Sequence, residues 1–233
     1  PPRGWLDPDK LRERRADLIQ LTLQGDRHGG SAVDYTVNVR VGLPFMTGPR
    51  DEPEPVNHVL PAWDLVTGQM VALGLLAPEG HRRRRGQGQH VKLALEDVAL
   101  AVMAHLGFTT EAELGSPRER HGNELFGAFG RDFVCADDER VMVVGLTLKQ
   151  WRSIVEAMDL AEPVARLAQR LGADLSQEGE RFRARGEIAA RVAPWFKARA
   201  FGQVAGALNR HGVCWRRYQG ISDLVRDDPS CSP

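Results

Sequence analysis

The sequence predicts an α/β protein, in which part of a parallel-sheet domain is followed by linker helices and a smaller α+β domain. Residues 7–15 suit a short capped helix, and residues 16–23 form an apolar, β-branched run typical of a buried strand that ends in a glycine-containing loop. A second helix, a strand over residues 89–95 and a helix over residues 96–109 repeat this order. Alternating helices and strands are typical of parallel sheets.

A stretch rich in proline, glycine and acidic residues, over residues 42–61, separates the two α/β units and is predicted to be an ordered loop or linker. After it, apolar residues recur at three- and four-residue spacing over residues 63–76, which puts them on one face of a helix. Pro78 and Gly80 are expected to end this helix.

The smaller domain is predicted to begin with a β-hairpin. Residues 129–135 and 140–145 flank an acidic turn at Asp137 and Asp138, and Thr147 is expected to cap the helix that follows. Further amphipathic helices are predicted over residues 187–199 and 201–210, with a last strand over residues 213–218.

Composition excludes several classes of protein. Lysine plus arginine equals aspartate plus glutamate at 31 each, so no global field attracts nucleic acid or an anionic membrane. The longest apolar stretches are far shorter than the ~20 residues of a membrane span. Cys135, Cys214 and Cys231 are too few and too scattered for a disulfide framework. A soluble, cytoplasmic protein is expected.

Asp64 is the most promising catalytic residue, because it falls in or just before the first turn of the helix over residues 63–76 and lies off the apolar stripe. Free backbone N–H groups and the positive end of the helix dipole favour an ionised carboxylate there. Such a carboxylate can attack an acyl carbonyl and form an anhydride. On position alone, however, a helix cap is the commoner role for an aspartate.

The remaining motifs favour structural roles. The basic run over residues 82–85 is followed by glycines but matches neither a dinucleotide-binding nor a Walker motif, so it is expected to close a helix, with a smaller chance that an arginine meets a polyphosphate. The histidines show no metal-ligand spacing, so no metal site is expected. His105 is interpreted as a core residue. His58, six residues before Asp64, is a weaker candidate for lining a substrate pocket.

Glycines ahead of the predicted hairpin form another candidate for ligand contact. Gly127 and Gly130 could let the backbone approach a substrate closely, although a tight entry into the strand explains them equally well. Cys135 is expected to be a buried strand thiol without an activating base, which argues against a cysteine nucleophile.

Several short motifs occur along the chain in the same order as in a known protein family. They are Arg15–Ile19, Asp64 with Thr67-Gly68 three residues later, Arg85–Val91, Leu95-Glu96-Asp97, Gly122-Asn123, Asn209–Val213 and Asp227-Asp228-Pro229. In this order they resemble the class III, or CaiB/BaiF-type, coenzyme A transferases. The likeness extends over essentially the whole chain. The stretches over residues 33–38, 42–49, 56–64 and 125–133 resemble most the members that move CoA between the two carboxyl groups of mesaconate.

The resemblance implies that Asp64 is the nucleophile. It attacks the thioester of an acyl-CoA to give a mixed anhydride, and CoA then returns to form an aspartyl-CoA thioester. The other carboxylate of mesaconate attacks this thioester. No cofactor beyond the CoA of the substrate, no metal and no nucleic acid or membrane partner is implied, and family members are interlocked homodimers.

The resemblance also implies a division of the chain. Residues 1–50 would end a large Rossmann-like domain, residues 51–118 would form the linker and the helix-strand-helix unit with the nucleophile, and residues 119–233 would form the small α+β domain. The chain begins without methionine and stops where no element closes, so a segment of a longer polypeptide is expected, without most of the N-terminal half that contacts CoA.

Other functions stay open. An intermolecular acyl-CoA:carboxylate transferase would use the same nucleophile. An α-methylacyl-CoA racemase of the same family would pair Asp64 with a histidine base, for which the setting of His28 is a poor match. A non-catalytic binding module would need Asp64 only as a helix cap.

Overall fold

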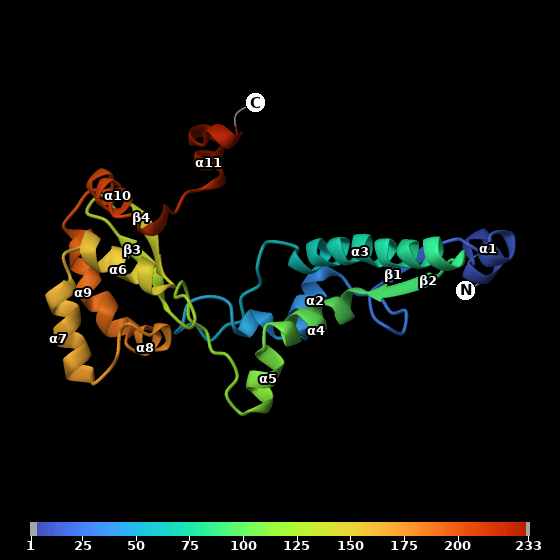
Figure 1. Cartoon of the computed structure of the whole chain (residues 1–233), viewed down its shortest axis with the longest axis horizontal. Helices are drawn as coiled ribbons and strands as arrows, with labels where there is room; N and C mark the ends of the chain where they lie inside the picture. Colours follow the sequence, from blue (N-terminus) through green and yellow to red (C-terminus); the bar gives the residue numbers. More distant parts are fainter. Residues whose placement is uncertain (1–3, 232–233) are drawn as a thin grey trace. The chain divides into compact units, whose positions relative to one another are not determined.

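The computed structural model describes residues 4–231, which divide into two compact units, one up to Gly122 and one from Asn123 onward (Figure 1). The chain is mixed α/β. The first unit contains a parallel sheet and the second an antiparallel sheet.

The first unit is built around two parallel strands. Its elements are η1 (Gly4–Leu6), α1 (Pro8–Arg14), β1 (Gln20–Gln24), α2 (Asp34–Arg40), η2 (Leu43–Phe45), α3 (Ala62–Arg85), β2 (His90–Ala94), α4 (Leu95–His105) and α5 (Phe108–Glu113). Strands β1 and β2 pair in register from Gln20 opposite His90 to Gln24 opposite Ala94. The long helix α3 lies along both strands (Figure 1). As predicted, Asp7 caps α1 and accepts hydrogen bonds from the N–H groups of Asp9 and Lys10.

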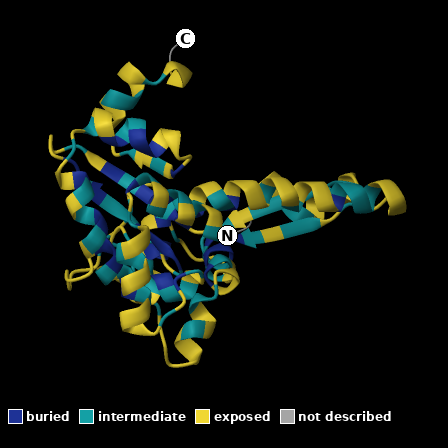
Figure 2. Ribbon diagram, turned by 60° about the vertical axis from the view of Figure 1, so that its left-hand side comes forward, coloured by how far each residue is buried: buried dark blue, intermediate teal, exposed yellow. Residues whose placement is uncertain are grey.

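The core of the first unit joins α2, α3 and α4. It consists of Val37, Trp63, Leu95, Ala99 and Met103. Trp63 stands in the first turn of α3, so this core holds the beginning of the helix in place. The rest of α3 is mostly exposed, as Figure 2 shows.

Two helix ends differ from the prediction. Helix α3 does not stop at Pro78 but continues to Arg85, where Gly86 adopts a left-handed conformation (φ 68°) and its N–H bonds to the carbonyl of Arg82 at 2.7 Å. A proline removes one helical hydrogen bond without forbidding the next turn, and Glu79 pairs with Arg82 and Arg83 across that turn.

The helix over residues 96–109 is in fact two helices. Gly107, with φ 82°, breaks the chain between α4 and α5. His105 therefore lies at the end of α4 and is exposed, so its interpretation as a core residue is wrong. No element was predicted where α2 forms, because residues 34–40 show no clean apolar period.

The second unit is a three-stranded antiparallel sheet with helices. Its elements are β3 (Phe129–Val134), β4 (Arg140–Gly145), α6 (Leu148–Ala157), α7 (Ala161–Leu171), α8 (Glu178–Arg183), α9 (Arg185–Lys197), α10 (Phe201–Arg210), β5 (Cys214–Arg217), α11 (Ile221–Asp227) and η3 (Pro229–Cys231). The strand order is β3-β4-β5. The predicted hairpin, the Thr147 cap, helix α10 and the last strand are confirmed.

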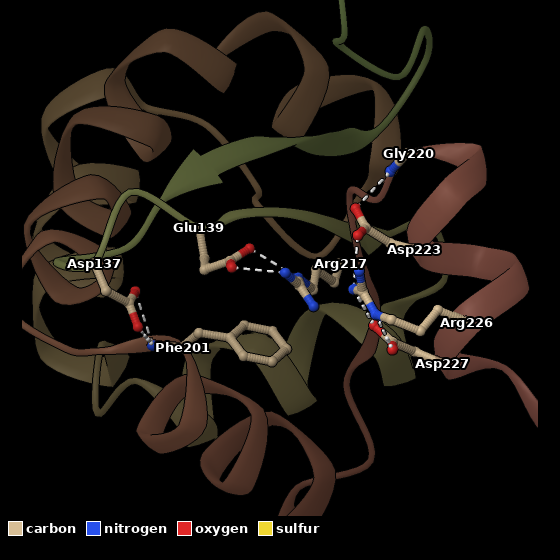
Figure 3. Close-up of polar contacts among 8 residues, drawn as sticks. All are labelled: Asp137, Glu139, Phe201, Arg217, Gly220, Asp223, Arg226 and Asp227. Carbon is tan, nitrogen blue, oxygen red and sulfur yellow. Dashed lines mark hydrogen bonds and ion pairs between the residues drawn. The ribbon is translucent and has the colours of Figure 1, made fainter.

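The acidic turn of the hairpin has a structural role. Both carboxylate oxygens of Asp137 accept from the N–H of Phe201, at 3.1 and 3.0 Å, which fastens the start of α10 to the hairpin (Figure 3). Glu139 accepts two hydrogen bonds from Arg217, both at 2.7 Å, and so joins β5 to the same turn. Arg226 similarly bridges Asp223 and Asp227 on α11.

Arg181 is the largest fully buried side chain of the second unit. Its guanidinium donates to the carbonyls of Ser176 at 2.8 Å, Leu175 at 3.1 Å and Leu146 at 2.8 Å. Burial lowers the pKa of Arg181. The side chain therefore ties α8 to the segment before it and to the residue that follows β4.

We expect Arg181→Met to lower the free energy of unfolding by about 3 kcal/mol, because several buried carbonyl groups would lose their donor. The matched control is Arg183→Met in the same helix, whose side chain is 72% exposed and pairs with Glu180. A surface change of this kind should alter stability by about 0.5 kcal/mol at most. Chemical denaturation of both variants measures the difference, and equal effects would contradict the structural role of Arg181.

Candidate active site

Asp64 is the third residue of α3, in the first turn of the helix. It lines a pocket of about 390 Å³ together with Thr67 and Gly68 of the same helix. The other walls are the carboxyl ends of the strands: Leu23, Gln24 and Gly25 at the end of β1, and Leu95 just after β2, with Ala32 and Val33 before α2. In open α/β sheets, ligands bind in crevices at this edge of the strands.

Two glycines, Gly25 and Gly68, are among the residues that line the pocket. A Cβ on Gly25 would lie 2.2 Å from the backbone nitrogen of Ala32, so no larger residue fits there without moving the chain. A Cβ on Gly68 would meet nothing within 4 Å, which leaves that side of α3 bare beside Asp64.

Asp34, and not Asp64, caps the N-terminus of α3. The N-cap position is Pro61, which offers no side-chain acceptor. Oδ2 of Asp34 accepts from the N–H of Trp63 at 2.7 Å and from the N–H of Asp64 at 3.2 Å. Asp34 is only 3% exposed, and its Oδ1 is buried without a hydrogen-bond partner among the described residues.

The carboxylate of Asp64 makes no hydrogen bond or ion pair with any part of the chain that the structure describes. The interpretation of Asp64 as a simple helix cap is therefore wrong, because another residue satisfies the backbone donors of this turn. Asp64 is exposed and is one of the residues that line the pocket.

Asn38, one helical turn after Asp34, connects α2 to the approach of α3. Its Oδ1 accepts from the indole Nε1 of Trp63 at 3.1 Å and lies 2.9 Å from Nε2 of His58. Its Nδ2 donates to Asn57 at 2.8 Å. Because Asn38 Oδ1 can only accept, Nε2 of His58 is the protonated ring nitrogen in this arrangement.

His58, which the sequence offered as a substrate contact, does not line the pocket of Asp64. The structure places it in the Asn38 network. Its contact with substrate stays a prediction.

Gly127 and Gly130, the other predicted contacts, belong to the second unit. Gly127 has φ 82°, which favours glycine, and a Cβ on Gly130 would press on Leu125 at 3.0 Å. Both glycines thus have local reasons to be glycine, and their approach to Asp64 stays a prediction.

Sequence reasoning missed Asp34, Asn38 and the buried hydroxyl of Thr67. Thr67 is 1% exposed and its Oγ1 has no hydrogen-bond partner among residues 4–231. Asp34 and Asn38 stand four residues apart, so they share one face of a helix. That spacing is lost as a signal when α2 itself is not predicted, and the resemblance of residues 33–38 to the family assigned no role to either side chain.

The described residues were also compared with the requirements of a metal site, a membrane span and a cysteine nucleophile. They contain no group of three histidine, cysteine or acidic side chains placed to hold a metal. Within them, no helix is long and apolar enough to cross a membrane. Cys135 is buried as expected, and burial is the main cause that raises the pKa of its thiol.

Comparison with known proteins identifies a matching family. The family described as CoA-transferase family III matches residues 2–231. The chain is 54% identical over 233 residues to 2-methylfumaryl-CoA isomerase of Chloroflexus aurantiacus, and covers 57% of that protein. It is 28% identical over 199 residues to succinyl-CoA:mesaconate CoA-transferase of Haloarcula marismortui, covering 82% of this chain and 48% of the relative.

Solved structures match the fold. A crystal structure of Rv3272 from Mycobacterium tuberculosis superimposes with a TM-score of 0.74 at 22% identity, over 97% of this chain and 59% of the other. A CaiB/BaiF family protein from Brucella suis gives 0.71 at 20% identity, over 96% and 58%. The chain thus spans less than two thirds of the length of each of these relatives.

We expect Asn38→Ala to lower the free energy of unfolding by about 2–3 kcal/mol, since Trp63 and His58 would both lose their acceptor. Asn57→Ala is the matched control. Asn57 is exposed, and its substitution removes only the hydrogen bond from Nδ2 of Asn38. Thermal melts followed by tryptophan fluorescence measure the two effects. An equal shift in both variants would contradict the central position of Asn38.

We also expect Cys135 to resist a thiol reagent in the folded protein, because its burial removes access and disfavours the thiolate. Cys214 and Cys231 are exposed and should react. Peptide mapping after brief treatment with iodoacetamide identifies the labelled positions. Rapid labelling of Cys135 under native conditions would show that the thiol is accessible after all.

Proposed function

The chain belongs to CoA-transferase family III, and from this premise we propose that it carries the nucleophile of an intramolecular CoA transferase, Asp64. The substrate proposed is 2-methylfumaryl-CoA and the product 3-methylfumaryl-CoA, so that CoA moves between the two carboxyl groups of mesaconate. The relative of Chloroflexus aurantiacus with 54% identity bears the name of this isomerase.

One observation carries the proposal. The carboxylate of Asp64 lies at a pocket at the carboxyl ends of the strands and is held by no hydrogen bond from the described residues. The carboxylate oxygens of an aspartate that caps a helix accept hydrogen bonds from backbone N–H groups. A carboxylate that is positioned but unengaged keeps its lone pairs for attack on an acyl carbon.

The reaction proceeds in four attacks. An oxygen of Asp64 attacks the thioester carbonyl, the C–S bond breaks, and a mixed anhydride and CoA thiolate form. The thiolate attacks the aspartyl carbonyl, which releases the mesaconate carboxylate and leaves an aspartyl-CoA thioester. The second carboxylate of mesaconate then attacks this thioester and expels the thiolate again. Attack of the thiolate on the acyl carbonyl of the new anhydride gives the product and restores Asp64.

This route requires that the pocket retain mesaconate between the two transfers. The freed dicarboxylate must turn before it diffuses away, and an enclosed site raises its effective concentration near the aspartyl thioester. Gly68, where a Cβ would meet nothing within 4 Å, lies beside Asp64 in the pocket wall and leaves open space for such a movement. We include Gly127 and Gly130 in the proposal as substrate contacts.

A racemase is the second function within the family, and it needs two bases on opposite sides of one carbon. Among the described residues that line the pocket, Asp64 is the only titratable side chain. His28 and His58 do not line it. The nucleophile is thus better supported than a pair of bases.

The complete enzyme is proposed to be a cytoplasmic homodimer that takes an acyl-CoA. Exposed apolar side chains along α3, including Leu65, Leu73 and Leu76, support a covering partner surface. The cysteines at positions 135, 214 and 231 are all free, which agrees with a reducing compartment.

In the complete protein, Asp64→Asn should lower the rate of isomerisation of 2-methylfumaryl-CoA by about a thousandfold or more, as loss of a nucleophile does. Stability should change by about 1 kcal/mol at most, since Asp34 does the capping. Steady-state rates and thermal melts are measured together. Asp9→Asn, a first-turn acid of α1, serves as control and should keep full activity. High turnover in the Asp64→Asn variant would refute the nucleophile.

Hydroxylamine separates catalysis from simple binding. During turnover it should cleave the aspartyl thioester and leave a hydroxamate on Asp64, detectable by mass spectrometry of the peptide. A non-catalytic binding module would give no such modification. A racemase would give none either, although it would exchange the α-hydrogen with solvent.

Intramolecular transfer predicts a further result. With 2-methylfumaryl-CoA and an excess of isotopically labelled free mesaconate, the product should carry no label, because the bound acid turns without leaving the pocket. Full labelling of the product would instead identify an intermolecular acyl-CoA:carboxylate transferase.

A further inference from the structure

We propose that Asp34 is the positioning residue of the active site: by occupying the backbone donors of the first turn of α3, it keeps the carboxylate of Asp64 turned toward the pocket. The inference rests on the proposed function of Asp64 as nucleophile and adds the reason why this carboxylate is free to attack. Asp34 itself need not touch the substrate.

The donors at this helix end are all accounted for. The N–H of Ala62 bonds to the carbonyl of Leu60 at 2.7 Å, and the N–H of Leu65 bonds to that of Pro61 at 3.1 Å. Between them, the N–H groups of Trp63 and Asp64 both donate to Oδ2 of Asp34. No donor in the turn is left for the side chain of Asp64.

Competition for these donors is the physical basis of the inference. The first N–H groups of a helix lack intrahelical partners and must find another acceptor. An acidic side chain in the first turn of a helix is itself attracted by the free N–H groups and by the positive end of the helix dipole. Without Asp34, the carboxylate of Asp64 would be the nearest acceptor on the same turn. The carboxylate would then turn away from the pocket, and its oxygens would accept hydrogen bonds instead of attacking the substrate.

Asp34 is well held for this task. It is 3% exposed, and it begins α2, whose Val37 packs in the core with Trp63. One turn later, Asn38 accepts from the indole of the same Trp63. Helix α2 thus holds the first turn of α3 through backbone and side chain together, which fixes the direction in which Asp64 leaves the helix.

Two variants of Asp34 in the complete protein test the proposal. Asp34→Ala removes the acceptor and should lower kcat by about ten- to a hundredfold, the effect of a misplaced reacting group. KM should change less than threefold, because no substrate contact is lost. Asp34→Asn keeps an oxygen that accepts the same two N–H groups, and should restore kcat to within about threefold of the parent.

Asp7→Ala is the matched control. Asp7 caps α1 in the same manner, with the N–H groups of Asp9 and Lys10 as donors, but its helix carries no proposed catalytic residue. This variant should lose thermal stability and keep kcat. The amount of active protein in every variant is normalised by the hydroxamate formed on Asp64 under exhaustive trapping, so that a smaller folded fraction is not taken for a slower enzyme.

The outcomes are distinct. A kcat in Asp34→Ala that equals that of Asp7→Ala would overturn the positioning role, as would loss of activity in both Asp34 variants, since the negative charge rather than the acceptor would then matter. If Asp34→Ala does not fold, Asp34→Leu replaces it, which keeps a similar volume without an acceptor, and parental kcat there would equally overturn the proposal. An inactive parent or an active Asp64→Asn variant would instead defeat the proposed function itself.

Discussion

The pair of hydrogen bonds from the first turn of α3 to the carboxylate of Asp34 is the constraint on which the candidate site depends. A helix N-terminus that begins at Pro61 has no acceptor of its own, and an uncapped turn beside a pocket would recruit whatever acceptor is nearest. Because the acceptor comes from α2, two helices far apart in the sequence must be assembled before Asp64 has a defined direction.

The surrounding core serves the same purpose. Trp63 is buried among Val37, Leu95, Ala99 and Met103, while its indole nitrogen bonds to Asn38. Leu95 also lines the pocket, so the core and the site share a wall. Packing of one aromatic side chain thereby sets the start of α3, the edge of the pocket and the position of the nucleophile relative to the strand ends.

The second unit is organised differently, with its own sheet and its own buried polar group. The buried guanidinium of Arg181 donates hydrogen bonds to loop carbonyl groups. The stacked rings of Phe133 and Phe196, with centroids 4.7 Å apart, join β3 to α9. The acidic hairpin turn, which the sequence singled out, holds α10 and β5 in place (Figure 3). Asp137 and Glu139 of this turn therefore have structural roles.

The sequence by itself determined the parts that depend on local chemistry. Residue spacing predicted the Asp7 cap of α1, both parallel strands, the hairpin and α10, because caps, alternation and turns act over a few residues. The same local signals failed at Pro78, where a helix continued through a residue that usually ends one. Asp64 stood out because it begins a periodic helix, and the order of motifs pointed to the CoA-transferase family.

Only the tertiary structure decided what Asp64 is free to do. From the position alone, capping was the commoner role for an aspartate there, and the resemblance to the family implied a nucleophile without saying what else would cap the helix. The acceptor that replaces it lies 30 residues earlier, on a helix with no clear period of its own. A contact between such distant residues is set by packing, here by Trp63 against α2, and packing is a property of the folded chain that no local pattern contains.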